Sequence, residues 1–151
     1  VIMPEDGPKP VSFLNGPMGQ AKADYLSELW GRYFDSAWVS GGTYTTQQKK
    51  SAEAFAAAIW EIVYEDVPSA PLYWDVTVDS TLGNRGFKAA NLDSQLANSW
   101  LRSLNGTGPM AELRALSNLG SQDFIVAVPE PATIVFAVVS LLLMSRKKLF
   151  A

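Results

Sequence analysis

The sequence predicts a small, mainly α-helical domain with one or two short strands, followed by a short C-terminal transmembrane helix. Apolar residues recur at helical spacing in several segments between residues 21 and 127, whereas a single segment alternates with the period of a strand. An uncharged apolar run followed by basic residues closes the chain. A length of 151 residues predicts one modest core.

Residues 1–20 form a lead-in with four prolines and three glycines, a density that disfavours helices. VSFL, residues 11–14, is the candidate strand in this stretch. The start has neither the basic nor the apolar region of a signal peptide. If the C-terminal segment is an export feature, we expect further sequence upstream that carries the signal.

Residues 23–38 predict the first helix, with Asp24 as a plausible N-cap. Its apolar stripe is formed by Leu26, Leu29, Trp30, Tyr33 and Phe34. Residues 47–66 predict a second helix, in which Thr45 and Gln48 have the spacing of a capping box. Its inward side is expected to be Phe55, Ala58, Ile59, Ile62 and Val63, and its mostly outward side Lys49, Lys50, Glu53 and Glu61.

Pro68 and Pro71 are expected to terminate that helix, and residues 72–79 then alternate apolar and polar side chains. This alternation predicts a short strand or extended edge segment. Residues 89–104 predict a third helix, which Asn105-Gly106 stops. Pro109 would then begin a short last helix over residues 110–120.

Charge and composition exclude several classes of function. Residues 1–128 carry nine basic and fourteen acidic residues, a net charge of −5, whereas residues 129–151 carry three basic and one acidic, a net charge of +2. An acidic body lacks the basic footprint of a nucleic-acid-binding protein. The chain has no Cys and no His, which removes disulfides, thiolate nucleophiles and imidazole bases. We predict no cofactor and no metal.

Acidic residues are the first candidates for chemistry. Glu61 and Glu65 are one helical turn apart and Asp66 follows, which suits an acid/base pair or a metal site. By the usual preference of Glu for the surface, a solvated helix face is the alternative. Asp75 and Asp79 have part of the spacing of a calcium loop, without its glycine or terminal glutamate.

Aromatic residues are the second candidates. Tyr44, Tyr73 and Trp74 lie in segments expected to be loops or edges, where a ring can contact a glycan. Packing in the core is the alternative for Trp74, because an indole ring buries a large area. Asn105-Gly106-Thr107 fits the glycosylation pattern, and it also fits a helix-ending turn.

The segments LSELWGRYFDSAW, AFAAAIWEIVYE, NSWLRSL and QDFIVAVPEP resemble exported bacterial proteins whose body is similar to the thioester-domain (TQXA-type) surface adhesins. The similarity spans Tyr25 to Val128, and AIWEIVYE carries most of it. In those adhesins a Cys and a Gln form a reactive internal ester. Ala56 stands where the Gln would be and the chain has no Cys, so the resemblance implies the scaffold without the ester chemistry.

The C-terminal run from Ala132 to Ser145 is fourteen uncharged residues, about 21 Å as a helix against a hydrocarbon core of about 30 Å. A core helix of a small domain would show a polar face, and this run has none. Arg146, Lys147 and Lys148 directly after it place the C-terminus in the cytoplasm. A short apolar helix next to a recognition motif is typical of a signal that is recognised in the membrane and then removed. An ordinary membrane anchor is the alternative.

This order of Pro129-Glu130-Pro131, apolar helix and basic cluster resembles the bacterial PEP-CTERM sorting signal over Val128 to Lys148. The resemblance implies that an exosortase, a membrane-embedded cysteine protease-like enzyme, reads the Pro-Glu-Pro motif. It also implies removal of the helix and the basic residues, followed by release or surface attachment, commonly in bacteria that make an exopolysaccharide matrix.

We therefore expect a non-enzymatic surface or extracellular-matrix protein, held briefly in the inner membrane by residues 132–145 and then located at the cell surface or outside the cell. Its expected partners are an exosortase and exopolysaccharide. An adhesin-like module that binds a glycan or protein through Tyr44, Tyr73 or Trp74 is the first alternative. A glycan hydrolase using Glu61, Glu65 or Asp75 is the second.

Overall fold

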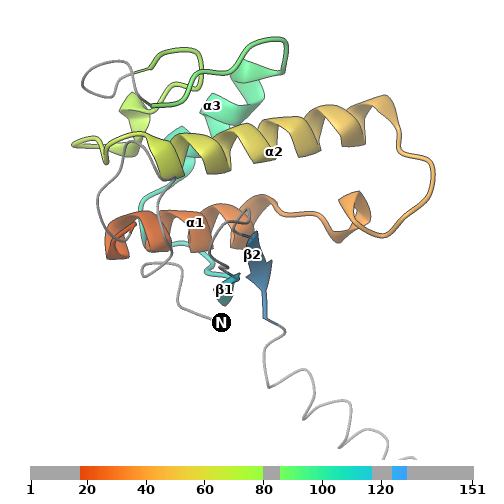
Figure 1. The fold of residues 1–151 in the computed structure, drawn as a ribbon, viewed down its shortest axis with the longest axis horizontal. Coiled ribbons are helices and arrows are strands. Elements are labelled where there is room, and N and C mark those ends of the chain that lie inside the picture. The colour runs from red at the N-terminus through yellow and green to blue at the C-terminus, as the bar shows by residue number, and fades with distance from the viewer. Residues whose placement is uncertain (1–17, 80–85, 117–123, 129–151) are drawn as a thin grey trace, which may run out of the picture.

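A computed structural model describes residues 18–79, 86–116 and 124–128. Three α-helices dominate this part, with a single 3₁₀ turn between each helix and the next and two paired strands after the last helix (Figure 1). In chain order the elements are α1 (Gln20–Tyr33), η2 (Ser36–Trp38), α2 (Thr46–Tyr64), η3 (Pro71–Tyr73), α3 (Ser94–Ser103), β1 (Leu113–Leu116) and β2 (Phe124–Ala127). The prediction of a small, mainly helical domain with short strands is confirmed.

Helix α1 begins earlier than predicted, because Gly19 and not Asp24 is its N-cap. Gly19 has a φ of 87°, a left-handed conformation that glycine adopts without steric cost. Asp24 instead accepts a hydrogen bond from Gln20 Nε2 at 2.7 Å within the first turns. The predicted apolar stripe is confirmed: Leu26 and Leu29 are buried, and the aromatic residues that follow pack against the core.

Helix α2 begins at the predicted capping box. Thr45 Oγ1 accepts the backbone N–H of Gln48 at 3.1 Å, and Gln48 Oε1 accepts the N–H of Thr45 at 2.9 Å. The predicted inward residues lie in or against the core, with Phe55, Ala58 and Ile62 fully buried. The long axis of α2 runs beside α1 (Figure 1), and α3 packs against both of these helices.

The predicted strand over residues 72–79 does not form. Pro71 begins the 3₁₀ turn η3, and the chain then runs in irregular conformation. Trp74 and Val76 are buried, as the alternation implies, but Leu72 and Val78 are more than half exposed. No described strand lies beside this segment, and side chains of α2 and α3 accept its backbone N–H groups instead.

Helix α3 lies within the range predicted for the third helix, and Asp93 caps it by accepting the N–H of Leu96 at 3.0 Å. The expected apolar stripe faces the core. Leu104 belongs to the buried core, and Leu92, Leu96 and Trp100 pack against that core. Ala97 and Leu101 between them are fully buried. The chain leaves the helix at Leu104, directly before the predicted Asn105-Gly106 stop.

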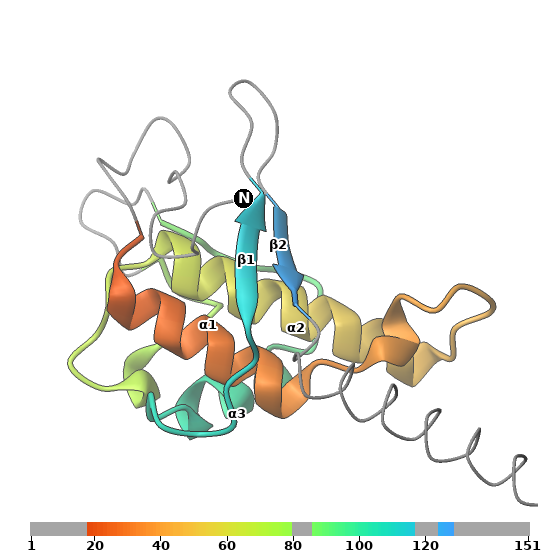
Figure 2. The same ribbon diagram turned by 90° about the horizontal axis from the view of Figure 1, so that it is seen from below.

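The helix predicted over residues 110–120 is wrong, because Leu113–Leu116 forms β1. It pairs antiparallel with β2 in the register Leu113↔Ala127 to Leu116↔Phe124. Glu112, Leu113, Arg114 and Ala115 alternate polar with apolar, and Leu113 and Ala115 are the buried pair. Cross-strand pairing therefore overrides the helix propensity of this segment. The hairpin lies across α1 (Figure 2).

Two of the predicted features lie outside the described residues, namely the candidate strand 11–14 and the transmembrane helix 132–145. Within the described ranges, none of the helices combines the length and the hydropathy needed to cross a bilayer.

Candidate functional site

The residues of the predicted sorting signal, Pro129 to Pro131 and Arg146 to Lys148, also lie outside the described part of the chain. The structure does describe the residue that precedes the signal. The N–H of Val128 donates to the carbonyl oxygen of Glu112 at 2.8 Å, which extends the hairpin ladder by one residue beyond β2. The folded body is thus hydrogen-bonded up to the edge of the Pro-Glu-Pro motif.

The candidate carboxylates Glu61 and Glu65 do not form a solvated face, so that expectation is wrong. Both side chains are fully buried. Glu61 Oε1 accepts the N–H of Asp75 at 3.0 Å, and Glu65 Oε1 accepts the N–H of Phe87 at 2.5 Å. The two carboxyl groups tie the irregular connection between α2 and α3 to the end of α2.

Burial raises the pKa of Glu61 to about 8, and the nearby acidic groups of Glu65, Asp75 and Asp79 add to this, against the opposing N–H of Asp75. Glu61 is therefore neutral near pH 7. Its second oxygen, Oε2, is buried without a hydrogen-bond partner among the described residues. A raised pKa suits a general acid, but a side chain with no exposed surface does not reach a polysaccharide in this conformation.

Asp75 organises the start of the irregular connection. Its Oδ1 accepts the N–H and the hydroxyl of Thr77 at 3.0 and 2.7 Å and the amide of Asn98 at 2.8 Å. The Thr77 hydroxyl, together with the other donors and Arg102, lowers the pKa of Asp75 despite partial burial. Asn98 in turn accepts the N–H of Val76 at 3.0 Å, so α3 holds this segment from the opposite side to α2.

Asp79 accepts the N–H of Gly86, and Asp66 is exposed after the end of α2. In the part of the chain that the structure describes, no group of three or more Asp or Glu residues has the arrangement of a metal site. Each of the two carboxylates with calcium-loop spacing, Asp75 and Asp79, accepts a backbone N–H group, from Thr77 and Gly86 respectively.

The three candidate aromatic residues differ in how deeply they are buried. Trp74 is 1 % exposed and packs edge-on against Tyr25, with 5.0 Å between ring centroids, so it takes the core position that was the alternative. Tyr73, on η3, is 63 % exposed. Tyr44 is half-buried before α2, and its hydroxyl accepts the N–H of Gly41 at 3.2 Å.

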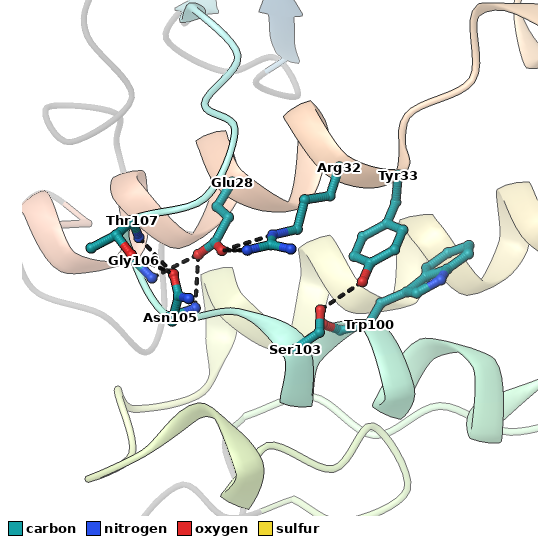
Figure 3. Close-up of polar contacts among 8 residues, drawn as sticks. All are labelled: Glu28, Arg32, Tyr33, Trp100, Ser103, Asn105, Gly106 and Thr107. Atoms are coloured by element: carbon teal, nitrogen blue, oxygen red, sulfur yellow. Dashed lines mark hydrogen bonds and ion pairs between the residues drawn. The ribbon is translucent and has the colours of Figure 1, made fainter.

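The sequence interpretation missed a third buried carboxylate, Glu28 on α1 (Figure 3). One oxygen accepts Arg32 Nε at 2.8 Å, and the other accepts the N–H groups of Asn105 and Gly106 at 2.9 and 2.6 Å. Burial alone would raise the pKa of Glu28, but the N–H groups of Asn105 and Gly106, together with the hydrogen bond and the positive charge of Arg32, lower it below its ordinary value. Glu28 and Arg32 stand one turn apart, a spacing that could have indicated an ion pair but not its burial.

The turn that Glu28 binds is the Asn105-Gly106-Thr107 segment. Asn105 Oδ1 accepts both the N–H and the hydroxyl of Thr107 at 2.8 Å, and Gly106 has a φ of 77°. This is the turn predicted as the alternative to a glycosylation site. Gly108 follows and lies directly over the side chains of Glu28 and Arg32, where a Cβ would meet their polar atoms.

A second feature that the sequence did not reveal is a stack of rings from three elements. Tyr33 of α1 stacks on Trp100 of α3 at 5.0 Å, and Trp38 of η2 lies on the same indole at 6.5 Å. All three are half-buried, and the hydroxyl of Tyr33 is 2.6 Å from Ser103 Oγ (Figure 3). The stack joins α1 to α3 at the rim of the core.

No protein-family model, no curated protein and no solved structure matches this chain. The resemblances to the thioester-domain adhesins and to the sorting signal therefore stay predictions from the sequence.

Proposed function

We propose that this chain is an exported bacterial surface or matrix protein, addressed by a C-terminal sorting signal of the PEP-CTERM type. The observation that carries the proposal is the order of three features: Pro129-Glu130-Pro131, the uncharged run 132–145, and the basic cluster 146–148. Each feature has a separate physical role, and the three follow one another directly over residues 129–148.

The apolar run inserts into the bilayer because it has no charged residue to expel it. Arg146 to Lys148 keep the C-terminus in the cytoplasm, so the body lies on the other side of the membrane. At about 21 Å the helix is shorter than the hydrocarbon core of about 30 Å, which makes a weak permanent anchor and suits a segment that is removed.

A non-enzymatic role for the body is supported by how its acidic groups are used. Glu28, Glu61 and Glu65 are fully buried, and each accepts backbone N–H groups of a connecting segment. Carboxylates that hold loops in place in this way stabilise the fold, and they are not presented to a substrate.

The test is to express the gene with its upstream reading frame in a bacterium with an active exosortase and in the same strain without it. We expect a shortened form in the first strain and the full-length, membrane-bound form in the second. A variant with Pro129→Ala and Pro131→Ala should stay full-length in both. Glu53→Gln, on the exposed side of α2, is the matched control and should be shortened like the wild type. A chain that is full-length in both strains would refute the proposal.

A second candidate, a glycan- or protein-binding module, is favoured by the exposure of Leu72 and Tyr73 on η3. Backbone hydrogen bonds of Tyr73 and Trp74 hold this turn, so its exposed side chains project from a fixed position. Binding of the mature protein to purified exopolysaccharide is the measurement. Tyr73→Ala should abolish binding, whereas Val39→Ala, another exposed apolar position, should not. Binding that survives Tyr73→Ala would leave this site without support.

A further inference from the structure

The hairpin ladder ends where the sorting motif begins. Leu113 pairs with Ala127, and the N–H of Val128 bonds to Glu112, so the body holds the backbone through Val128. Pro129 has no N–H and does not continue the ladder. The last hydrogen-bonded residue of the body is therefore the immediate neighbour of the motif.

The distance left for an enzyme is short. Only three residues, Pro129 to Pro131, separate Val128 from the apolar run that starts at Ala132. Four extended residue steps reach at most about 14 Å, and the polar headgroup layer on one side takes up about 5–7 Å of that. With the tail inserted, the folded body and the bilayer face each other across the motif alone.

An enzyme that reads a backbone segment needs that segment extended and accessible on its edges. While β2 stays paired, the chain on the N-terminal side of Pro129 is bound to β1 and backed by the body. The enzyme then has access to the motif only if the strand leading into it is freed.

The two strands are held very unequally, which makes this release possible without unfolding. In β1, Leu113 and Ala115 are 3 % and 4 % exposed and belong to the core. In β2, Phe124 and Ala127 are exposed, and Ile125 is the residue that packs against the core. Detaching β2 breaks ladder hydrogen bonds and exposes two partly buried side chains, Ile125 and Val126, whereas Leu113 of β1 belongs to the core that the helices form.

We propose that β2 is a releasable strand: Phe124–Val128 leaves β1 before the sorting enzyme engages Pro129 to Pro131. The inference rests on the proposed sorting function. It adds that the folded body restricts access to its own signal and that opening of the hairpin is a required step.

The absence of Cys from the chain allows a direct test. Arg114 and Val126 are cross-strand partners, so Arg114→Cys with Val126→Cys would form a disulfide between β1 and β2 in the oxidising compartment outside the inner membrane. The two single variants are the matched controls. Each replaces one of the two side chains but cannot form the disulfide between the strands. In a strain with an active exosortase, we expect the disulfide-linked chain to stay full-length and both single variants to be shortened. Adding a reductant should restore shortening of the double variant, which a misfolded chain would not show.

Shortening of the disulfide-linked chain at the rate of the single variants would overturn the inference and leave the sorting function intact. A wild-type chain that is never shortened would refute the sorting function itself. Hydrogen exchange of the full chain then tests the strand without any enzyme. We expect the ladder amides of β2 to exchange at least about tenfold faster than those in the middle of α2, by local opening. Equal rates would mean that β2 opens only when the whole body unfolds, and would overturn the inference.

Discussion

The carboxylate of Glu28 accepts the backbone N–H of Gly106 at 2.6 Å, although the two residues are 78 positions apart. This bond joins α1 to the turn after α3, and Arg32 completes the set of donors (Figure 3). The carboxylate is buried, so its charge is balanced entirely by these neighbours. The same arrangement recurs at Glu61 and Glu65, where a buried carboxyl group holds a connecting segment.

Replacing Glu28 should therefore destabilise the fold strongly. Glu28→Ala removes a buried carboxylate and leaves two partly buried N–H groups and the guanidinium of Arg32 without their acceptor, which should lower the free energy of unfolding by about 3–5 kcal/mol. Glu28→Gln should cost less, about 1–3 kcal/mol, because one amide oxygen remains. Urea unfolding of the full chain measures both, with the exposed Glu53→Gln as control. A change within about 0.5 kcal/mol for Glu28→Ala would show that the network contributes nothing.

Gly31→Ala should also destabilise the fold. In an exposed helix position, replacing Gly by Ala stabilises by about 0.4–1 kcal/mol. At Gly31, however, an added Cβ would lie within van der Waals overlap of the Pro109 carbonyl, where the chain crosses α1. We expect a loss of about 1–3 kcal/mol in urea unfolding. A gain in stability would mean that residues 109–111 do not pack on α1 as described.

The stability of the fold should fall as the pH rises from weakly acidic to weakly alkaline because of Glu61. Its pKa is about 8 in the fold, against 4.5 as the ordinary value. A group with a raised pKa contributes its full stabilisation below the ordinary value, and the contribution is lost as the pH rises through the folded value. The urea midpoint of the wild type should therefore decline, relative to that of Glu61→Gln, as the pH rises from 4.5 to about 8, and the difference should level off above that. Parallel midpoints for the two chains from about pH 6 to pH 10 would contradict the assignment.

Asn98→Asp should destabilise in neutral solution and recover in acid. Asn98 donates its amide to Asp75 at 2.8 Å, so a carboxylate there would face a carboxylate of like charge. We expect a loss of about 2 kcal/mol or more near pH 7 that shrinks as the pH approaches about 4. Asn91→Asp is the control, since Asn91 is exposed and has a left-handed φ of 61° that Asp also tolerates. An equal, small effect of both substitutions would argue against the Asn98 contact.

Local signals predicted the helices well. The Thr45–Gln48 capping box and the apolar stripes of the three helices are in the structure as expected, because both are set by residues within a few positions of each other. Asp24 failed as a cap because the helix extends back to Gln20, where Gly19 supplies the conformation without a side-chain hydrogen bond.

Long-range contacts explain what the sequence did not reveal. Glu61 was expected outside because glutamate is mostly exposed, and its burial depends on the N–H of Asp75, which comes from an irregular segment. The segment containing Leu113 has strong helix formers, yet its pairing with β2 decides its conformation. The alternation of Glu112 to Ala115 was a usable strand signal. The Glu28 network had no comparable signal, since its partners come from a turn distant in sequence.

The central claim is that the C-terminal segment is an address that is read and removed. The intact mass of the protein, isolated from cells with an active exosortase, tests it most directly. We expect a C-terminus near Pro129 to Pro131, with the apolar run and the basic cluster absent from the mature chain. A mature protein whose mass includes every residue through Ala151 would contradict it.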